Sequence, residues 1–364
     1  MVLDYTCTES VEAGLLIDRF IQKAGLFVLS QPFSFGVVCG RINKKYQGGG
    51  FMKVAAIQLN AEFANVAANL QQAEKTISAA AQQGAKIVVL PEFFTSAIGF
   101  APQMLTVAAQ NAPVTAWMAE MAARHQCMLG GSYLIFDGAH AYNLFTLALP
   151  DGQIFQHKKD LPTQFENCYY TKGDTIHVLS TPIGPVGVAL CWEMIRYDTV
   201  KRLKGKVQFV LAGSCWWDLP IDAPAEKLPL RQYNQSLAWN TPSTFAKLLG
   251  VPVIHASHCG RVTAFRFPAG DAQQTRQLVG AAQIVNGDGT VLARKGFEQG
   301  SGVITAEISP AVVQLSHPLE QLPAHYWIPD LPPSYLHAWQ TLNVQGQAYY
   351  ETTARPYYKK HDTK

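Results

Sequence analysis

Apolar segments of strand length alternate with amphipathic segments of helix length from residue 54 onward, and this alternation constrains the fold more than any other feature. Residues 54–59 and 85–90 are nearly unbroken apolar runs, as expected of strands that are covered on both faces. Between them, apolar residues within 65–83 recur every three to four positions, which predicts a helix that ends at Gly84. Two strands joined by a helix form a βαβ unit with a right-handed crossover.

The same pattern recurs further along the chain. It predicts helices at residues 114–125, 197–203 and 237–249, and strands at residues 127–136, 142–149, 186–190, 207–211 and 251–257. The sequence Asn286-Gly287-Asp288-Gly289 separates two short apolar segments and indicates a tight hairpin turn. This order of elements is typical of α/β proteins, in which helices cover a largely parallel sheet.

The composition limits the kinds of partner. Of the 364 residues, 48% are hydrophobic and 15% are charged, and the formal net charge of +3 creates no strong field for nucleic acid or an anionic membrane. The apolar stretch at residues 24–40 is interrupted by Gln31 and Pro32 and falls short of a membrane span. The seven cysteines form no CxxC pair, which favours reduced thiols in a cytoplasmic protein. We therefore expect a small-molecule partner, with neither nucleic acid nor membrane.

Three segments of the chain differ in character. Residues 1–51 show no clear period and end in a Gly-rich linker, so we expect an N-terminal extension outside the fold, with Met52 as the true start. Residues 52–310 carry the α/β pattern and form the predicted domain. Residues 311–364 are rich in proline and tyrosine, and we expect this tail to lie on another surface, as an oligomer contact.

Reactive side chains follow two of the predicted strands, and a lysine pair follows a further short strand. Glu92 comes after residues 85–90 and is either a buried proton shuttle with a raised pKa or a surface glutamate at a proline turn. Cys191 comes after residues 186–190 and is either a nucleophile or a small buried hydrophobe. The Lys158-Lys159 pair is either a solvated turn or a source of positive charge. A base, a cation and a thiol together are what nucleophilic attack on an acyl-type carbon requires.

The order of these segments resembles that of a known family. The sequence contains Leu90-Pro91-Glu92, then Lys159-x-x-Pro162-Thr163, then Cys191-Trp192-Glu193. Over roughly residues 52–310 this order resembles the nitrilase superfamily, also called the carbon-nitrogen hydrolases, and the hairpin at 286–289 resembles a late hairpin of that family. The spacing of His157, Lys159 and Pro162 selects Lys159 over Lys158 as the family's lysine.

The resemblance implies a fold and a set of roles. The fold would be α/β, a four-layer α-β-β-α sandwich of the nitrilase type, paired into a homodimer or a higher homo-oligomer. Glu92 matches the family's general base, Lys159 its lysine, Cys191 its nucleophile and Glu166 a second glutamate. The implied chemistry needs no metal and no organic cofactor.

The expected activity is hydrolysis of a small amide through a thioester on Cys191, with release of ammonia or an amine. Acidic amides are among the expected substrates. After Glu193, the sequence Met194-Ile195-Arg196 departs from the pattern of true nitrilases, which favours an amidase over the alternative of a nitrilase that converts a nitrile to a carboxylic acid. Hydrolysis of an N-carbamoyl amine, acyl transfer and a non-catalytic scaffold are further alternatives.

Three residues are candidates for substrate binding. The backbone N–H of Trp192 would stabilise developing negative charge on the substrate. Arg196 either binds a substrate carboxylate or begins a helix in solvent. Trp216 either forms a wall of the substrate pocket or packs in the core. The segment 255–259 offers two histidines and a cysteine, but it lacks a second ligand cluster, so we expect a pocket rim there and no metal.

Overall fold

A computed structural model describes residues 50–265, 273–311 and 325–362 of the chain. Strand β1 (Met52–Leu59) follows the Gly-rich linker, and all but its first two residues are buried. The predicted extension at residues 1–51 lies almost wholly outside the described residues, so its role stays a prediction. Within the described ranges, no helix is both long and apolar enough to cross a membrane.

The expected βαβ unit is present at the start of the domain. β1 pairs in parallel with β2 (Ile87–Val89), and α2 (Val66–Gln82) connects them. The Asn65 side chain accepts a hydrogen bond from the backbone N–H of Ala68 and so caps the first turn of α2. The apolar face of α2, which includes Ala73 and Ile77, is buried against the sheet.

Further elements complete the fold. The other helices are α3 (Met104–Gln110), α4 (Val114–His125), α5 (Tyr197–Leu203), α6 (Leu228–Leu249), α7 (Pro333–Tyr349) and α8 (Arg355–His361). The other strands are β3 (Met128–Phe136), β4 (Ala141–Ala148), β5 (Ile154–Lys158), β6 (Val178–Thr181), β7 (Gly184–Leu190), β8 (Val210–Ser214), β9 (Trp217–Pro220), β10 (Val253–His258), β11 (Arg261–Phe265), β12 (Gln274–Leu278), β13 (Gly280–Val285), β14 (Val291–Gly296) and β15 (Gly302–Ile308). The single-turn helices are η2 (Gln164–Cys168), η3 (Cys191–Ile195), η4 (Ala225–Lys227), η5 (Phe297–Gln299) and η7 (Tyr350–Ala354).

The large sheet has two halves. The first half has the strand order β5-β4-β3-β2-β1-β15, and the second has the order β6-β7-β8-β10-β13-β14. The halves meet where the ends of β1 and β10 pair, at Gln58 with Ser257 and Leu59 with His258. A smaller sheet has the order β11-β12-β9.

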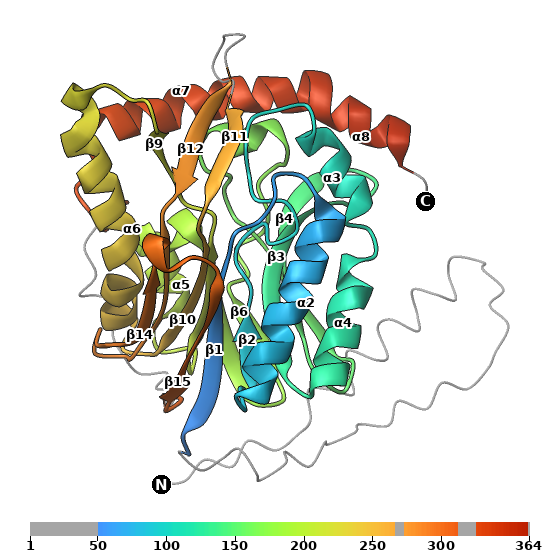
Figure 1. Ribbon diagram of the computed structural model, residues 1–364, viewed down its shortest axis with the longest axis vertical. Coiled ribbons are helices and arrows are strands. Elements are labelled where there is room, and N and C mark those ends of the chain that lie inside the picture. The colour runs from blue at the N-terminus through green and yellow to red at the C-terminus, as the bar shows by residue number, and fades with distance from the viewer. Residues whose placement is uncertain (1–49, 266–272, 312–324, 363–364) are drawn as a thin grey trace, which may run out of the picture. The chain divides into compact units, whose positions relative to one another are not determined.

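Buried clusters show how the halves are layered. One cluster, with Val54 and Phe145 from the first half and Leu190 and Ile254 from the second, lies between the two halves. A second cluster packs α2 and α4 on the outside of the first half, and a third packs α5 and α6 on the outside of the second. Figure 1 shows these helices flanking the strands. The predicted α/β fold, a four-layer α-β-β-α sandwich, is confirmed.

Most predicted elements occur with small shifts. The turn at residues 286–289 joins β13 and β14 as predicted, and the N–H of Asn286 donates to the carbonyl oxygen of Thr290 at 2.8 Å. The strand predicted at 207–211 lies slightly later, as β8. The helix predicted at 237–249 begins earlier, at Leu228. The prediction began too late because the first turns of α6 are partly exposed and carry polar residues that hide the apolar period.

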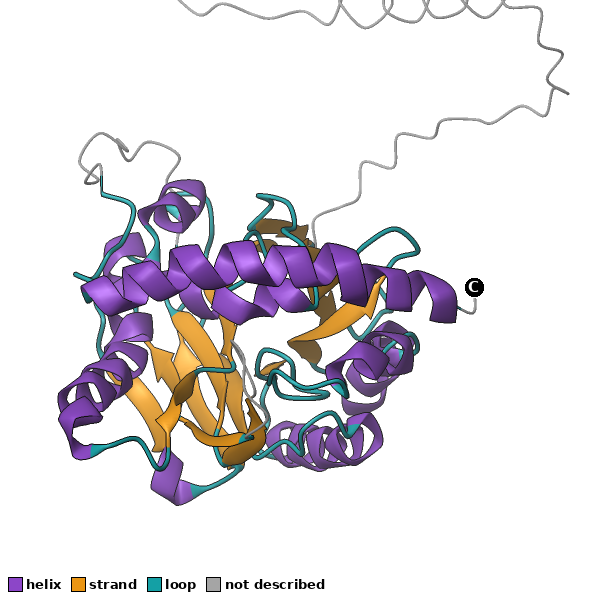
Figure 2. Ribbon diagram, turned by 90° about the horizontal axis from the view of Figure 1, so that it is seen from above, coloured by secondary structure: helices purple, strands orange, loops and turns teal. Residues whose placement is uncertain are grey.

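The described part of the C-terminal tail, residues 325–362, is largely helical and packs on the chain's own domain. Asn167 in η2 donates a side-chain hydrogen bond to Asn343 Oδ1 in α7 at 2.9 Å, and Tyr358 in α8 donates to the carbonyl oxygen of Tyr169 at 3.0 Å. The two segments approach so closely at Gly346 that a Cβ there would lie 2.8 Å from the Cβ of Asn167. Figures 1 and 2 show the tail crossing one end of the sheet. Its predicted role as an oligomer contact, and the homo-oligomer itself, stay predictions.

Candidate active site

The strands that carry the predicted site residues end at one edge of the sheet. β7, β8, β10, β1 and β2 run parallel to one another. β5 runs in the same direction, because it is antiparallel to β4, which is antiparallel to β3, and β3 is parallel to β2. Glu92, Lys159 and Cys191 follow the carboxyl ends of β2, β5 and β7, so strand pairing brings distant parts of the sequence to one edge.

Glu92 is fully buried and held at both carboxylate oxygens. Oε1 accepts hydrogen bonds from Lys159 Nζ at 2.8 Å and from Asn143 Nδ2 at 2.9 Å, while Oε2 accepts one from the backbone N–H of Cys215 at 3.0 Å. Burial raises the pKa of Glu92 to about 7, with Lys159 opposing that rise and Glu166 adding to it. A carboxyl group with this pKa can both take and return a proton near neutral pH.

Lys159 lies between two carboxylates. Its Nζ donates to Glu92, to Glu166 Oε2 at 2.8 Å and to Thr163 Oγ1 at 3.2 Å. The same oxygen of Glu166 also accepts hydrogen bonds from the Thr163 N–H and the Tyr170 hydroxyl. Burial alone would lower the pKa of Lys159, but the charges of Glu166 and Glu92 raise it well above its ordinary value. The ammonium group is therefore a permanent positive charge at this edge of the sheet.

Cys191 begins η3 directly after β7. Its φ is +50°, in the left-handed region that non-glycine residues rarely adopt, and such strain is concentrated at functional sites. Burial raises the pKa of the Cys191 thiol well above its ordinary value, the charge of Glu92 raises it further, and Lys159 acts in the opposite direction. The resting thiol is therefore protonated and needs a base in order to react.

Glu193, to which sequence reasoning gave no role, connects two of these strand ends. Its Oε2 accepts a hydrogen bond from the Leu190 N–H at 2.7 Å, and its Oε1 accepts one from the Asp160 N–H at 2.8 Å. Both oxygens also lie 3.2 Å from Nε2 of His157, whose Nδ1 donates to the Ile176 carbonyl. Since both ring nitrogens of His157 face acceptors, the ring is held protonated, and Glu193 raises its pKa against the effect of burial.

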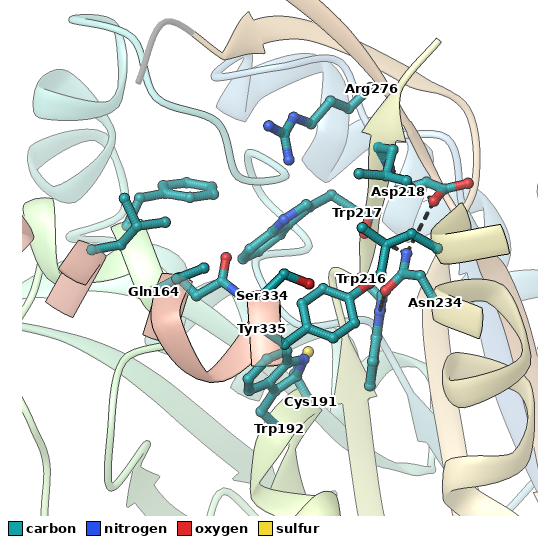
Figure 3. Close-up of a pocket in the computed structure, with 15 residues that line it drawn as sticks. Gln164, Cys191, Trp192, Trp216, Trp217, Asp218, Asn234, Arg276, Ser334 and Tyr335 are labelled. Carbon is teal, nitrogen blue, oxygen red and sulfur yellow. Dashed lines mark hydrogen bonds between the residues drawn. The ribbon is translucent and has the colours of Figure 1, made fainter. Parts of the chain in front are cut away.

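A cavity of about 230 Å³ opens onto Cys191, and five of the fifteen residues that line it are aromatic (Figure 3). The predicted substrate-binding residues Trp192 and Trp216 both line it, and Trp216 Nε1 donates to Asn234 Oδ1 at 2.9 Å. The cavity is lined by Gln164, Phe165, Cys191, Trp192, Trp216, Trp217, Asp218, Leu219, Leu230, Asn234, Arg276, Ser334, Tyr335, Ala338 and Leu342.

Arg196 does not line this cavity, which corrects both alternatives considered for it. Its Nη1 and Nη2 donate to the two carboxylate oxygens of Asp160 at 3.0 Å and 2.5 Å, and its Nε donates to the Trp192 carbonyl. Arg196 directly precedes α5, but its side chain is buried and not in solvent, and its guanidinium donates to Asp160 and the Trp192 carbonyl instead of a substrate carboxylate. Its guanidinium instead attaches η3 to the residue that follows Lys159.

The two histidines of segment 255–259 form hydrogen bonds within the protein. His258 Nε2 donates to the carbonyl oxygen of Glu92 at 2.8 Å, and His255 Nε2 lies 2.8 Å from Ser214 Oγ. Among the described residues, His157, His177 and Glu193 bring their ligand atoms within 4.8 Å of one another. Those atoms already serve hydrogen bonds to the backbone and to each other, as expected of a buried polar network.

A buried thiol beside an ammonium group and a carboxyl group of neutral pKa, on an α-β-β-α sandwich, defines a class of hydrolases that act on carbon–nitrogen bonds other than peptide bonds. Residues 53–317 match the carbon-nitrogen hydrolase family, and the chain belongs to that family.

Relatives and a solved structure agree with this assignment. The chain is 28% identical to nitrilase 3 of Arabidopsis thaliana over 320 residues, which cover 77% of this chain and 85% of that protein. It is 32% identical to an omega-amidase of Xenopus tropicalis over 153 residues, which cover 38% of this chain and 54% of that protein. The fold is similar to that of an amidase from Nesterenkonia sp., with a TM-score of 0.57 and 19% identity over 72% of this chain and 92% of the other.

Proposed function

We propose that the chain is a thiol-dependent amidase that hydrolyses a small amide through a thioester on Cys191. The observation that carries the proposal is the set of 2.8 Å contacts from Lys159 Nζ to Glu92 and Glu166, within electrostatic range of the Cys191 thiol. A base, a permanent cation and a nucleophile are thereby gathered at one edge of the sheet. Thiol attack on an acyl carbon requires these three groups.

In the first half of the reaction, Glu92 takes the thiol proton as the Cys191 sulfur forms a bond to the amide carbon. The raised thiol pKa and the Glu92 pKa of about 7 favour this coupled transfer over a thiolate that exists beforehand. The Lys159 ammonium and the backbone N–H of Trp192 stabilise the negative charge that develops on oxygen. The carbon–nitrogen bond then breaks, and protonated Glu92 returns its proton to the leaving ammonia or amine.

In the second half, Glu92 takes a proton from water, which attacks the thioester carbon; the carbon–sulfur bond then breaks, the carboxylic acid leaves, and Glu92 returns the proton to the Cys191 sulfur. Glu166 holds Lys159 through Oε2, while its Oε1 accepts no hydrogen bond from the described residues. We assign that oxygen to the substrate amide or to the attacking water.

A nitrilase is the second candidate. The alignment with nitrilase 3 spans 320 residues, whereas the alignment with the omega-amidase spans 153 residues. Attack of Cys191 on a nitrile carbon would use the same base and cation, so the residues at the strand ends serve either reaction. The length of the alignment favours the nitrilase, and the departure at Met194-Ile195-Arg196 favours the amidase.

Release of ammonia from matched nitriles, primary amides and N-carbamoyl amines tests the proposal. The full chain is compared with Cys191→Ala and with Cys127→Ala, which removes a buried thiol packed against α4. We expect amides to be the best substrates, with turnover lost in Cys191→Ala and kept in Cys127→Ala. Turnover that survives in Cys191→Ala contradicts the mechanism, and a preference for nitriles selects the second candidate.

Two further outcomes concern the remaining alternatives. A new amide that forms in preference to the free acid when a primary amine is added as acceptor would identify an acyl-transferring enzyme. A folded protein with no turnover on any of the three substrate classes, and a Cys191 thiol inert to alkylation, would favour a scaffold over an enzyme.

A further inference from the structure

Charge is distributed unevenly over the cavity next to Cys191. Asp218 and Arg276 are the two residues of opposite full charge among those that line it. Figure 3 shows Cys191 and Arg276 at opposite ends of the cavity, with the guanidinium of Arg276 pointing into the space above Trp217. A substrate that reacts at Cys191 therefore extends toward a cation.

Asp218, the acidic residue of the cavity wall, is bound by several donors of the protein itself. Its Oδ1 accepts hydrogen bonds from the Leu219 N–H at 2.8 Å and Asn234 Nδ2 at 3.1 Å, and its Oδ2 accepts one from Gln235 Nε2 at 2.7 Å. Arg231 Nε lies 3.6 Å from Oδ2 and supplies a positive charge from the side of α6. Asp218 thus has donors and a positive charge on the side of α6, and its charge also acts on Arg276.

Burial at the cavity wall weakens the hydration of Arg276. This burial lowers the pKa of Arg276 to about 10, although the charge of Asp218 raises it. An anion in the cavity would restore the stabilisation that burial removes from the guanidinium. Guanidinium groups bind carboxylates with particular strength, because their planar donors match the two oxygens.

The space between the two ends suits a flat, apolar body. Phe165 and Trp217 lie with ring centroids 4.6 Å apart, and Trp192 and Trp216 lie 6.2 Å apart. Tyr335 of α7 adds a further aromatic wall, and its ring centroid lies 6.2 Å from that of Trp192. Aromatic side chains favour stacked or edge-on contacts with a planar group.

We propose that Arg276 binds a carboxylate at the far end of the substrate, so that the preferred substrates are amides whose apolar or aromatic body carries a terminal carboxylate. This inference rests on the proposed amidase function. Arg276 takes the role that Arg196, bound to Asp160, does not have. Arg276 is a specificity-determining residue here, since it binds the end of the substrate that does not react.

The test uses two amides of nearly equal shape, 4-(carbamoylmethyl)benzoate and 2-(4-methylphenyl)acetamide. The first carries a carboxylate at the ring position where the second carries a methyl group. The readout is the ratio of their kcat/KM values in the full chain, in Arg276→Gln and Arg276→Lys, and in Arg124→Gln as a surface control. We expect a ratio in favour of the carboxylate that falls roughly 10- to 100-fold in Arg276→Gln. It should fall less in Arg276→Lys and stay unchanged in Arg124→Gln.

Failure of the carboxylate site and failure of the amidase proposal give different results. A ratio that is unchanged in Arg276→Gln, with turnover that still depends on Cys191, overturns the carboxylate site and leaves the amidase intact. Calorimetric binding of the same two amides to Cys191→Ala, with and without Arg276→Gln, decides the question even if neither amide is turned over. Tighter binding of the carboxylate that disappears in the double variant supports the site, and equal or absent binding of both amides overturns it.

Discussion

Replacement of Glu193 by glutamine tests how the nucleophile turn is held against the strand end that carries Lys159. The carboxylate accepts the Leu190 and Asp160 N–H groups at 2.7 and 2.8 Å, and it faces protonated His157 at 3.2 Å. Glutamine keeps one acceptor oxygen and replaces the other with a donor. One buried N–H then loses its partner, and the imidazolium loses its counter-charge.

The size of the effect follows from these contacts. An unpaired buried donor costs about 1–3 kcal/mol, and removal of one partner of a buried ion pair costs about 3–5 kcal/mol. Because both losses concern the same carboxylate, they are not independent, and we expect Glu193→Gln to lower the free energy of unfolding by about 3–5 kcal/mol. Urea unfolding of the two proteins measures it.

The matched control is Glu120→Gln in α4, an exposed glutamate whose ion pair with Arg124 is also exposed. Exposed pairs of this kind contribute about 0–1 kcal/mol. A loss in Glu193→Gln no larger than that of the control would refute the view that this carboxylate holds the two strand ends together. A His157→Gln variant, combined with Glu193→Gln in a double-mutant cycle, isolates the part that belongs to the pair.

The same pair predicts a dependence on pH. Although burial disfavours both charges, Glu193 raises the pKa of His157 above its ordinary 6.5, and His157 lowers the pKa of Glu193 below its ordinary 4.5. The stabilisation from His157 is complete below pH 6.5 and is lost as the pH rises through its folded-state pKa; that from Glu193 is complete above pH 4.5 and is lost on acidification. The difference in unfolding free energy between wild type and Glu193→Gln should therefore be largest between pH 4.5 and 6.5. A difference that grows above that range would contradict the assignment.

Three further outcomes are expected. Glu92→Gln should lower kcat/KM for the best amide by about 10²- to 10⁴-fold and remove the rise of activity with pH that wild type should show around pH 7, as seen in the two pH–rate profiles. Gly346→Val should loosen α7, because even a Cβ would lie 2.8 Å from Asn167, and hydrogen exchange in α7 as slow as in wild type would contradict that packing. A chain that begins at Met52 should unfold at the same urea concentration as the full chain, and a lower midpoint would mean that residues 1–51 contribute to the fold.

Glu92 and Cys191 were found from the sequence because each follows an apolar run that predicts a buried strand, and Lys159 was found from the family resemblance, because β5 (Ile154–Lys158) is not an apolar run. Glu92 and Cys191 each come within a few residues of a buried strand, and parallel pairing alone then brings them to the same edge. The partner of Arg196 was not legible in this way, because Asp160 lies 36 residues earlier and meets it only through the fold. Because Arg196 lies close to Cys191 in the sequence, it was a candidate for the substrate pocket, although in the fold its side chain binds Asp160.

The pocket wall formed by α7 was missed for a related reason. The prolines and tyrosines of the tail drew attention away from a short helical period in Tyr335, Ala338 and Leu342, which line the cavity. The pair Pro332-Pro333 just before them is a typical start of a helix and could have revealed it. Arg276 had no comparable signal, because Gln274–Leu278 lacks the apolar alternation of a half-buried strand.

Helix α7 forms part of the wall of the substrate cavity but carries none of the residues assigned to the reaction itself. The family match ends at residue 317, whereas Ser334 and Tyr335 line the cavity from a helix that begins at Pro333. Substitutions at Ser334, Ala338 and Leu342 can reshape the cavity and replace none of Glu92, Lys159 and Cys191, whereas Tyr335 also packs against Trp192 next to Cys191. Selection, or an engineer, can thus vary the C-terminal segment to explore new substrates while the reaction chemistry is inherited unchanged.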